Sequence, residues 1–234
     1  MADRSQLAWF RERLALSHAK EPREPSSILT WRRALASDLR FTAQLVGLHE
    51  MRGWHSLDNG NIVNQSREFF SIEGARVTNA GSREVTSWDQ PIFNQLEGGI
   101  LALIAREHLD RGVEFLLQAK AEPGNIGWLQ LCPSIQCTWS NLKKAHRGNV
   151  PPLAEVMLAG TGAGVRVIYR AYHNEEGGRF WRKSNENIVY FLDDDSLISS
   201  DLTHFRWASY TQIKELALID NVLSPFVKTI ICPL

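Results

Sequence analysis

The stretches VEFLLQAKAEPGN (residues 113–125) and LQLCPSIQCTWSN (residues 129–141) decide the fold of this chain. Both are rich in the apolar residues of core strands, and the EPGN tetrapeptide that ends the first stretch is typical of a turn. Both also carry amide or charged side chains, which are Gln118, Lys120, Glu122, Asn125, Gln130, Gln136 and Asn141. Because a buried polar group without a partner costs about 1–3 kcal/mol, we expect these side chains to build a polar site.

The first part of the chain is expected to be an N-terminal helical segment over residues 1–50. Apolar residues at helical spacing predict a first helix over residues 5–19. Ser26 or Ser27 can cap a second helix, with a helical stretch that continues through Gly47. This segment could cover a sheet or form a dimer contact.

Residues 51–234 are expected to form one further unit that is dominated by strands and contains no internal repeat. The expected strands are 68–77, 88–107 with a glycine break, 113–120, 129–138, 165–176 and 179–192. The expected helices are 139–146, a second that follows Pro152 and reaches residue 158, and a third over 211–219. The last two strands form a hairpin-like pair around Gly177 and Gly178. The pattern predicts the α+β class, with a mixed, mostly antiparallel sheet and flanking helices.

Composition and sequence pattern argue against several classes of protein. The 234 residues include 26 basic and 26 acidic residues, and this balance argues against a nucleic-acid-binding protein. The N-terminus lacks the pattern of a signal peptide, and no apolar run approaches the length of a membrane span. Cys132, Cys137 and Cys232 lack the spacing of a zinc site, so we expect free thiols and a cytoplasmic location.

Six segments of the chain resemble the NDP-hexose 2,3-dehydratase family of deoxysugar biosynthesis. In chain order they are SREFFSIEGARV, WDQPIFNQLEGGILALIARE, GVEFLLQAKAEPGN, LQLCPSIQCTWSN, EEGGRFWRKSNEN and HFRWASYTQIKEL. The resemblance implies a Nudix-like α+β fold, which the family usually carries in two tandem copies.

The resemblance also implies a lyase reaction on an NDP-4-keto-6-deoxyhexose. The ketone at carbon 4 acidifies the hydrogen on carbon 3, a base removes that hydrogen, and the hydroxyl on carbon 2 leaves. The enol that results tautomerises to a 3,4-diketo sugar. Such a site needs a base, an acid for the leaving hydroxyl and donors for the enolate oxygen. No cofactor and no metal are expected.

The chain departs from the family in three places. It holds one repeat, which implies a homodimer that rebuilds the tandem arrangement across a two-fold axis. Ser184 and Glu186 in the KSNEN stretch stand where the family commonly has arginines. The GTGAG stretch (residues 160–164) lies in a variable region, and because a strand follows it, it is not a dinucleotide fingerprint. The glutamate cluster of a Nudix hydrolase is also lacking.

Three residues are candidates for catalysis. Glu122 lies at a strand end, where a desolvated carboxylate could serve as general acid or base. Lys120 could donate to the ketone oxygen or bind phosphate, and the alternative is a structural ion pair between Lys120 and Glu122. His146 could act as acid or base near neutral pH, or it could simply interact with the C-terminus of its helix.

The remaining candidates are expected to bind substrate. Gln118, Gln130 and Gln136 could orient sugar hydroxyls or form a hydrogen-bonded ladder inside the sheet, and Asn125 is also a turn residue. Arg179, with Glu175 and Glu176, flanks the glycine turn and could instead be a solvated hairpin tip. Lys183, Asn185 and Asn187 alternate on one face, so they could contact phosphate or sugar together.

Two other functions stay open. The pocket could serve elimination, isomerisation or cyclisation of another small carbonyl compound. Alternatively, the chain could be an accessory protein that binds a ligand without catalysis.

Overall fold

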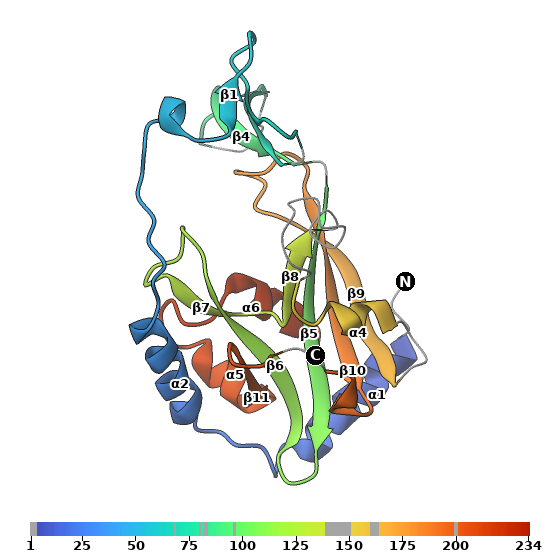
Figure 1. Ribbon diagram of the computed structural model, residues 1–234. Coiled ribbons are helices and arrows are strands. Elements are labelled where there is room, and N and C mark those ends of the chain that lie inside the picture. Colours follow the sequence, from blue (N-terminus) through green and yellow to red (C-terminus); the bar gives the residue numbers. More distant parts are fainter. Residues whose placement is uncertain are drawn as a thin grey trace.

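A forked β-sheet forms the centre of the molecule, a computed structural model that describes residues 4–67, 69–79, 81, 84–95, 97–138, 151–159, 164–198 and 201–234 (Figure 1). Its strands are β5 (Gly99–His108), β6 (Gly112–Ala121), β7 (Leu129–Cys132), β8 (Ile135–Thr138), β9 (Val165–Asn174), β10 (Ser184–Leu192) and β11 (Phe205–Ser209). The order is β11-β6-β5-β10-β9, with β7 beside β6 and β8 beside β5. The pairing of β10 with β5 is parallel, and the other pairs are antiparallel. The expected α+β class with a mostly antiparallel sheet is confirmed.

The fork arises because β5 and β6 pair only at their hairpin end. From Ile104 toward the N-terminus of β5, the partner strand becomes β8, while β6 continues beside β7. Ser134 lies where the two arms separate, with 1% of its surface exposed. Its hydroxyl accepts a hydrogen bond from the Ile104 amide at 2.9 Å and donates to the Leu116 carbonyl. A single buried hydroxyl therefore holds the two strands together at the branch point.

Ser134→Ala is expected to lower the free energy of unfolding by about 1–3 kcal/mol, because a buried amide and carbonyl lose this hydroxyl bridge. Urea denaturation measures the change. The matched control is Ser37→Ala, which removes a hydroxyl that bonds a carbonyl on the exposed surface. Equal midpoints for the two variants would show that the bridge adds nothing to stability.

Both faces of the large sheet are covered. The helices α1 (Arg4–Ser17), α2 (Ser26–Ser37), α5 (Tyr210–Leu216) and α6 (Pro225–Ile231) contribute buried residues to one apolar core. The short helix α4 (Ala154–Ala159) packs on the other face, in a second core. In the first core, the ring of Phe10 is fully buried and meets those of Phe115 and Phe191 edge-on, at 6.0 and 5.9 Å. The N-terminal helix is therefore part of the core of the sheet.

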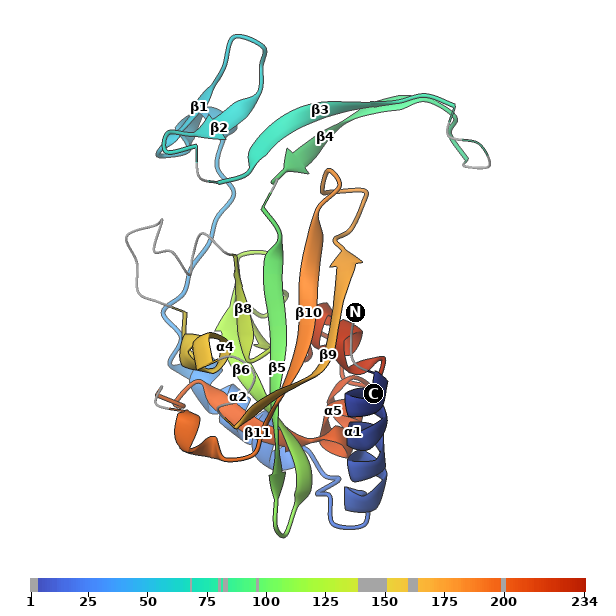
Figure 2. The ribbon, with the colours of Figure 1, turned by 90° about the vertical axis from the view of Figure 1, so that its right-hand side faces the viewer.

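A smaller, four-stranded sheet lies beyond the N-terminal end of β5 (Figure 2). Its strands are β1 (Trp54–Ser56), β2 (Ile62–Asn64), β3 (Ser71–Val77) and β4 (Trp88–Asn94). The turn between β9 and β10 docks on it, since Phe93 exchanges backbone hydrogen bonds with Arg179 and Trp181 at 2.8 Å. The ring of Phe180 packs against that of Phe93 at 5.6 Å. This contact joins the small sheet to the top of the large one.

Several sequence expectations differ from the structure. The second helix ends at Ser37 rather than Gly47, because the segment that follows offers no face to bury, with Leu45 and Val46 exposed. The expected strand 88–107 is divided between β4 and β5, which belong to different sheets. The strand expected from residue 179 begins at Ser184, because residues before it form the docking turn.

Other elements have no counterpart in the sequence expectations. These are β1, β2, β11, α6 and the 3-10 helices Leu48–Glu50 and Asp195–Leu197. The expected helix over residues 139–146 lies outside the described residues. The division into residues 1–50 and 51–234 stays a prediction. Among the described helices, none combines the length and the apolar character that crossing a membrane requires.

Candidate functional site

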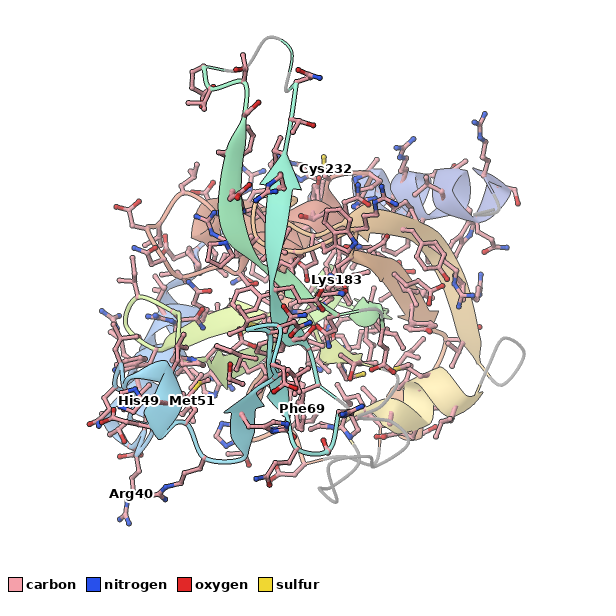
Figure 3. The ribbon with its side chains drawn as sticks, turned by 90° about the horizontal axis from the view of Figure 1, so that it is seen from above. Arg40, His49, Met51, Phe69, Lys183 and Cys232 are labelled. Atoms are coloured by element: carbon pink, nitrogen blue, oxygen red, sulfur yellow. The ribbon has the colours of Figure 1, made fainter. Side chains whose placement is uncertain are left out.

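Lys183 lies where the small sheet meets the large one, near the middle of the view from above in Figure 3. Its Nζ donates to Gln95 Oε1 at 2.7 Å and is 3.8 Å from Glu175 Oε1. The side chains of Lys183 and Glu175 are only 10% and 13% exposed. Burial lowers the pKa of Lys183, and the opposing influence of Glu175, followed by that of Glu97, offsets this only in part. The amine can therefore exchange a proton more readily than an ordinary lysine.

Asn185 fixes the carboxylate beside this amine. Its Nδ2 donates to Glu175 Oε1 at 2.6 Å, and its Oδ1 accepts from the Gly99 amide at 2.8 Å. A Cβ on Gly99 would lie 2.8 Å from the same Oδ1, and one on Gly98 would lie 2.6 Å from the Ser184 carbonyl. The two glycines that the sequence shows as a break thus allow β5 to approach β10 closely enough for this bond.

A second lysine–carboxylate pair lies between the arms of the forked sheet. Lys120 Nζ is 3.0 Å from Glu122 Oε1, and Gln136 Nε2 donates to the same oxygen at 2.9 Å. About a third of each charged side chain is exposed, at 32% for Lys120 and 35% for Glu122. Gln136 Oε1 is buried and has no hydrogen-bond partner among the described residues. The side-chain oxygen of Gln136 is therefore available as a hydrogen-bond acceptor beside the Glu122 carboxylate, which is paired with Lys120.

Glu97 connects the two pairs electrostatically. Burial raises the pKa of Cys137 to about 11, Lys120 acts in the opposite direction, and Glu97 adds to the rise. Burial, followed by the charge of Glu122, likewise raises the pKa of Cys132 to about 11. Both thiols are therefore protonated near neutral pH.

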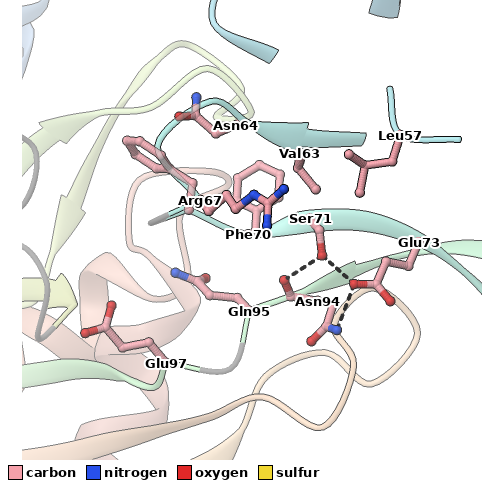
Figure 4. A pocket seen from close by; sticks show the side chains of 11 residues that line it. Leu57, Val63, Asn64, Arg67, Phe70, Ser71, Glu73, Asn94, Gln95 and Glu97 are labelled. Carbon is pink, nitrogen blue, oxygen red and sulfur yellow. Dashed lines mark hydrogen bonds between the residues drawn. The ribbon is translucent and has the colours of Figure 1, made fainter. Parts of the chain in front are cut away.

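A cavity of about 380 Å³, lined by both apolar and polar side chains, lies on the side of the small sheet and includes Gln95, the partner of Lys183 (Figure 4). Its polar lining includes Asn64, Arg67, Glu73, Asn94, Gln95 and Glu97. Asn94 donates to Glu73 at 2.9 Å, and its own Oδ1 is buried without a hydrogen-bond partner among the described residues. Gln95 both lines this cavity and accepts from Lys183, so it connects the amine to the lining of the cavity.

A second cavity, of about 520 Å³, lies beside the other pair. Its lining is mostly apolar. It includes Leu35 from α2, Leu39 two residues beyond the end of α2, and Phe205 from β11. Gln118 and Lys120 supply polar groups from β6. Lys120 thus lines the second cavity, and Gln95, the hydrogen-bond partner of Lys183, lines the first.

The structure brings several of the residues singled out in the sequence into this region. Lys120, Glu122 and Gln136 form one cluster, and Lys183 and Asn185 both contact Glu175. Gln130 is the direct register partner of Lys120 on β7, and Gln118 lines the apolar cavity.

Three other residues have structural partners away from these groups. Asn125 donates to the Trp128 carbonyl at 3.0 Å within the turn, and Arg179 is exposed at the docking turn. Asn187 is 1% exposed and donates to the Asn185 carbonyl at 3.2 Å. His146 lies outside the described residues.

Gln95 and Glu97 are functional candidates that sequence reasoning missed, and Glu175 was seen only as part of a charged hairpin tip. Gln95 and Glu97 interrupt the apolar run of residues 88–107, so the signal that singled out residues 113–141 was present there too. The expectation placed a glycine break in this run but did not assign its two halves to different sheets. The chain instead leaves one sheet and enters the other at these residues.

Comparisons with known proteins show the family of the chain. The family model described as NDP-hexose 2,3-dehydratase matches residues 25–234. Three curated relatives are each named dTDP-4-dehydro-6-deoxy-alpha-D-glucopyranose 2,3-dehydratase. The protein from Saccharopolyspora spinosa is 39% identical over 172 residues, that from Amycolatopsis orientalis 38% over 175, and that from Streptomyces violaceoruber 33% over 230. These matches cover 73%, 73% and 97% of this chain, but only 34%, 36% and 45% of the relatives.

Among solved structures, the chain is similar to a Nudix hydrolase from M. smegmatis, RenU, with a TM-score of 0.35 and 14% identity. That similarity covers 66% of this chain and 92% of RenU. The C-terminal domain of mouse MUTYH, solved in complex with human PCNA, matches with a TM-score of 0.35 and 13% identity. The match covers 59% of this chain and 87% of the MUTYH chain.

Proposed function

Because the chain belongs to the NDP-hexose 2,3-dehydratase family, we propose that it is a lyase that removes water from carbons 2 and 3 of an NDP-4-keto-6-deoxyhexose in natural-product biosynthesis. The single observation that carries the proposal is the buried amine of Lys183, with its lowered pKa, beside a carboxylate and bonded to Gln95 in the lining of a cavity. A proton-transfer group is what the reaction needs most.

Lys183 is assigned to the proton on carbon 3. In its neutral form the amine removes that proton, and the electron pair moves toward the ketone at carbon 4. Gln95 and Glu175 hold the amine in place from two sides. Glu175 also stabilises the ammonium that forms, since an opposite charge at this distance in a buried site favours the charged state.

Lys120, Glu122 and Gln136 are assigned to the departing hydroxyl and the enolate. Lys120 supplies positive charge to the oxygen that gains electron density. Glu122, held by Lys120 and Gln136, binds the hydroxyl of carbon 2 and relays to it a proton from the Lys120 ammonium as the hydroxyl leaves as water. Gln118, Gln130, Asn125, Asn185, Asn187 and Arg179 are assigned to substrate binding, and His146 remains a further acid–base candidate.

The proposal extends to assembly and location. The chain spans less than half the length of the curated relatives that it matches, each of which is long enough for two such units. A homodimer that places two copies about a two-fold axis would reproduce that arrangement. We also propose that the protein works in the cytoplasm, where its buried thiols stay reduced.

A direct assay tests the reaction. The protein is incubated with dTDP-4-keto-6-deoxyglucose generated in situ, and mass spectrometry follows the loss of one water from the nucleotide sugar. Substrate that carries deuterium at carbon 3 establishes the position of elimination. Either the deuterium is expected to exchange, or the reaction is expected to slow. No loss of water, together with no thermal shift by any nucleotide sugar, would rule out this function.

Glu122→Gln is expected to lower kcat/KM by about 10- to 100-fold, about 1.4–2.7 kcal/mol of transition-state stabilisation, because the amide keeps the shape of the side chain but cannot transfer the proton. The control is Glu215→Gln on α5, where the side chain is exposed. Initial rates at several substrate concentrations separate kcat from KM. Full activity in Glu122→Gln would remove this residue from the mechanism and leave the family assignment intact.

A further inference from the structure

A basic cavity of about 400 Å³ lies at the other end of the sheet, beside the hairpin that joins β5 and β6. We call it the hairpin cavity and define it by the lining residues Ser27, Arg106, His108, Arg111, Arg206 and Trp207, together with Glu114. Arg106 is seven residues from Gly99 along β5, which corresponds to about 23 Å at the rise of a strand. The hairpin cavity is therefore separate from the site around Lys183.

The charged groups that line the hairpin cavity are mostly positive. Arg106, Arg111 and Arg206 contribute three positive charges, and Glu114 contributes one negative charge, which leaves an excess of two. Glu114 is 1% exposed and is bonded by Arg106 at 3.1 Å and by Arg111 at 2.7 Å. Its role is to hold the two guanidinium groups in fixed positions at the cavity.

Contacts with aromatic rings and a backbone amide position three of the side chains that line the hairpin cavity. The guanidinium of Arg106 lies 4.0 Å from the ring centre of Trp207, and that of Arg206 lies 5.6 Å from the ring centre of Trp31. Nδ1 of His108 accepts a hydrogen bond from the Asp110 amide, so a neutral imidazole carries its proton on Nε2 and acts as a donor there. Donors that are already positioned bind a ligand without the cost of ordering long side chains.

We infer that the hairpin cavity binds the phosphoryl or diphosphate group of a small molecule. Guanidinium groups match phosphoryl oxygens in geometry and charge, and the excess of two positive charges balances a doubly charged anion. The hydroxyl of Ser27 adds a further donor. The concave shape and the neutral chain as a whole favour a small ligand over a nucleic acid. This inference does not rest on the dehydration proposed above.

Isothermal titration of the protein with pyrophosphate at low ionic strength tests the inference. Binding is expected, and added salt should weaken it, because charge dominates. Arg206→Gln and Arg111→Gln are each expected to weaken binding about tenfold, since each removes one charge-assisted contact. Arg206 is exposed, so its substitution spares the fold, and thermal melting checks that Arg111→Gln stays folded.

Two controls locate the bound anion. Arg33→Gln changes an exposed arginine on α2 that does not line the cavity and whose guanidinium bonds Thr30, and it should leave the affinity unchanged. Lys183→Met should also leave it unchanged, because that residue belongs to the other site. The inference is overturned if pyrophosphate does not bind, or if Lys183→Met abolishes binding while Arg206→Gln does not.

Titration with dTDP identifies the source of the phosphoryl group. A similar loss of affinity for dTDP and pyrophosphate in Arg206→Gln would indicate that the cavity takes the diphosphate of a nucleotide. A loss for pyrophosphate alone would indicate a free or non-nucleotide phosphoryl group. Both outcomes support the hairpin cavity as an anion site, whereas unchanged affinity for both ligands contradicts it.

Discussion

Lys183→Met is expected to lower kcat for dehydration by about 10²–10⁴-fold, the usual contribution of a positioned proton-transfer group. Methionine fills the same space without an amine, and Glu175 keeps its hydrogen bond from Asn185 at 2.6 Å. The loss should therefore appear in kcat more than in KM. The control is Lys228→Met on α6, where the side chain is exposed and far from the site in sequence.

The pH profile separates a catalytic amine from a merely structural one. Burial lowers the pKa of Lys183 from 10.5, so the neutral, basic form is populated at lower pH than for a free lysine. The rate should rise with pH along a limb whose inflection lies below 10.5. Lys183→Met should lose this limb, and Lys183→Arg should not restore it, because a guanidinium does not release its proton. A wild-type limb that persists in Lys183→Met would assign the titration to another group.

Phe10→Ala is expected to destabilise the protein by about 3–5 kcal/mol, because the change removes a large aromatic side chain and leaves a cavity. The ring is fully buried and contacts Phe115 on β6 and Phe191 on β10. In a chain of this length, such a loss corresponds to a decrease in Tm of about 10 °C. Differential scanning calorimetry measures it.

Phe10 lies before the region that matches the family model, which begins at residue 25. The outcome therefore tests whether α1 is an integral part of the folded unit rather than a detachable cover. Leu45→Ala is the control, since that side chain is fully exposed and should leave Tm unchanged. A Tm for Phe10→Ala within a degree or so of the control, against the few degrees expected per kcal/mol, would show that α1 packs only loosely on the sheet.

Much of the fold could be predicted from local pattern. The patterns of residues 113–120 and 165–176 predict strands, and β6 and β9 occupy nearly the same positions. The glycine turn at residues 177–178 predicts a hairpin, and β9 and β10 pair in antiparallel register. Local rules succeed here because each strand shows its two faces in its own sequence.

The same rules fail where the partner of a segment is distant in sequence. The glycines at 98–99 predict a break within residues 88–107, but they do not reveal that β4 and β5 on its two sides belong to different sheets. β11 and α6 escaped notice because short elements carry too little periodicity to be distinguished from loops. Their stability comes from packing on the sheet, which the local sequence does not contain.

By itself, the sequence determined the α+β class, the family and the presence of polar groups within apolar strands, because these depend on local pattern and composition. Only the tertiary structure decided which polar groups meet. Lys183, Gln95 and Glu175 come from three separate segments, and Asn185 bonds Gly99 across 86 positions of the chain. The parallel register of β10 on β5 creates that contact. Register between distant strands is set by the packing of the whole core, so no single stretch of sequence could reveal it.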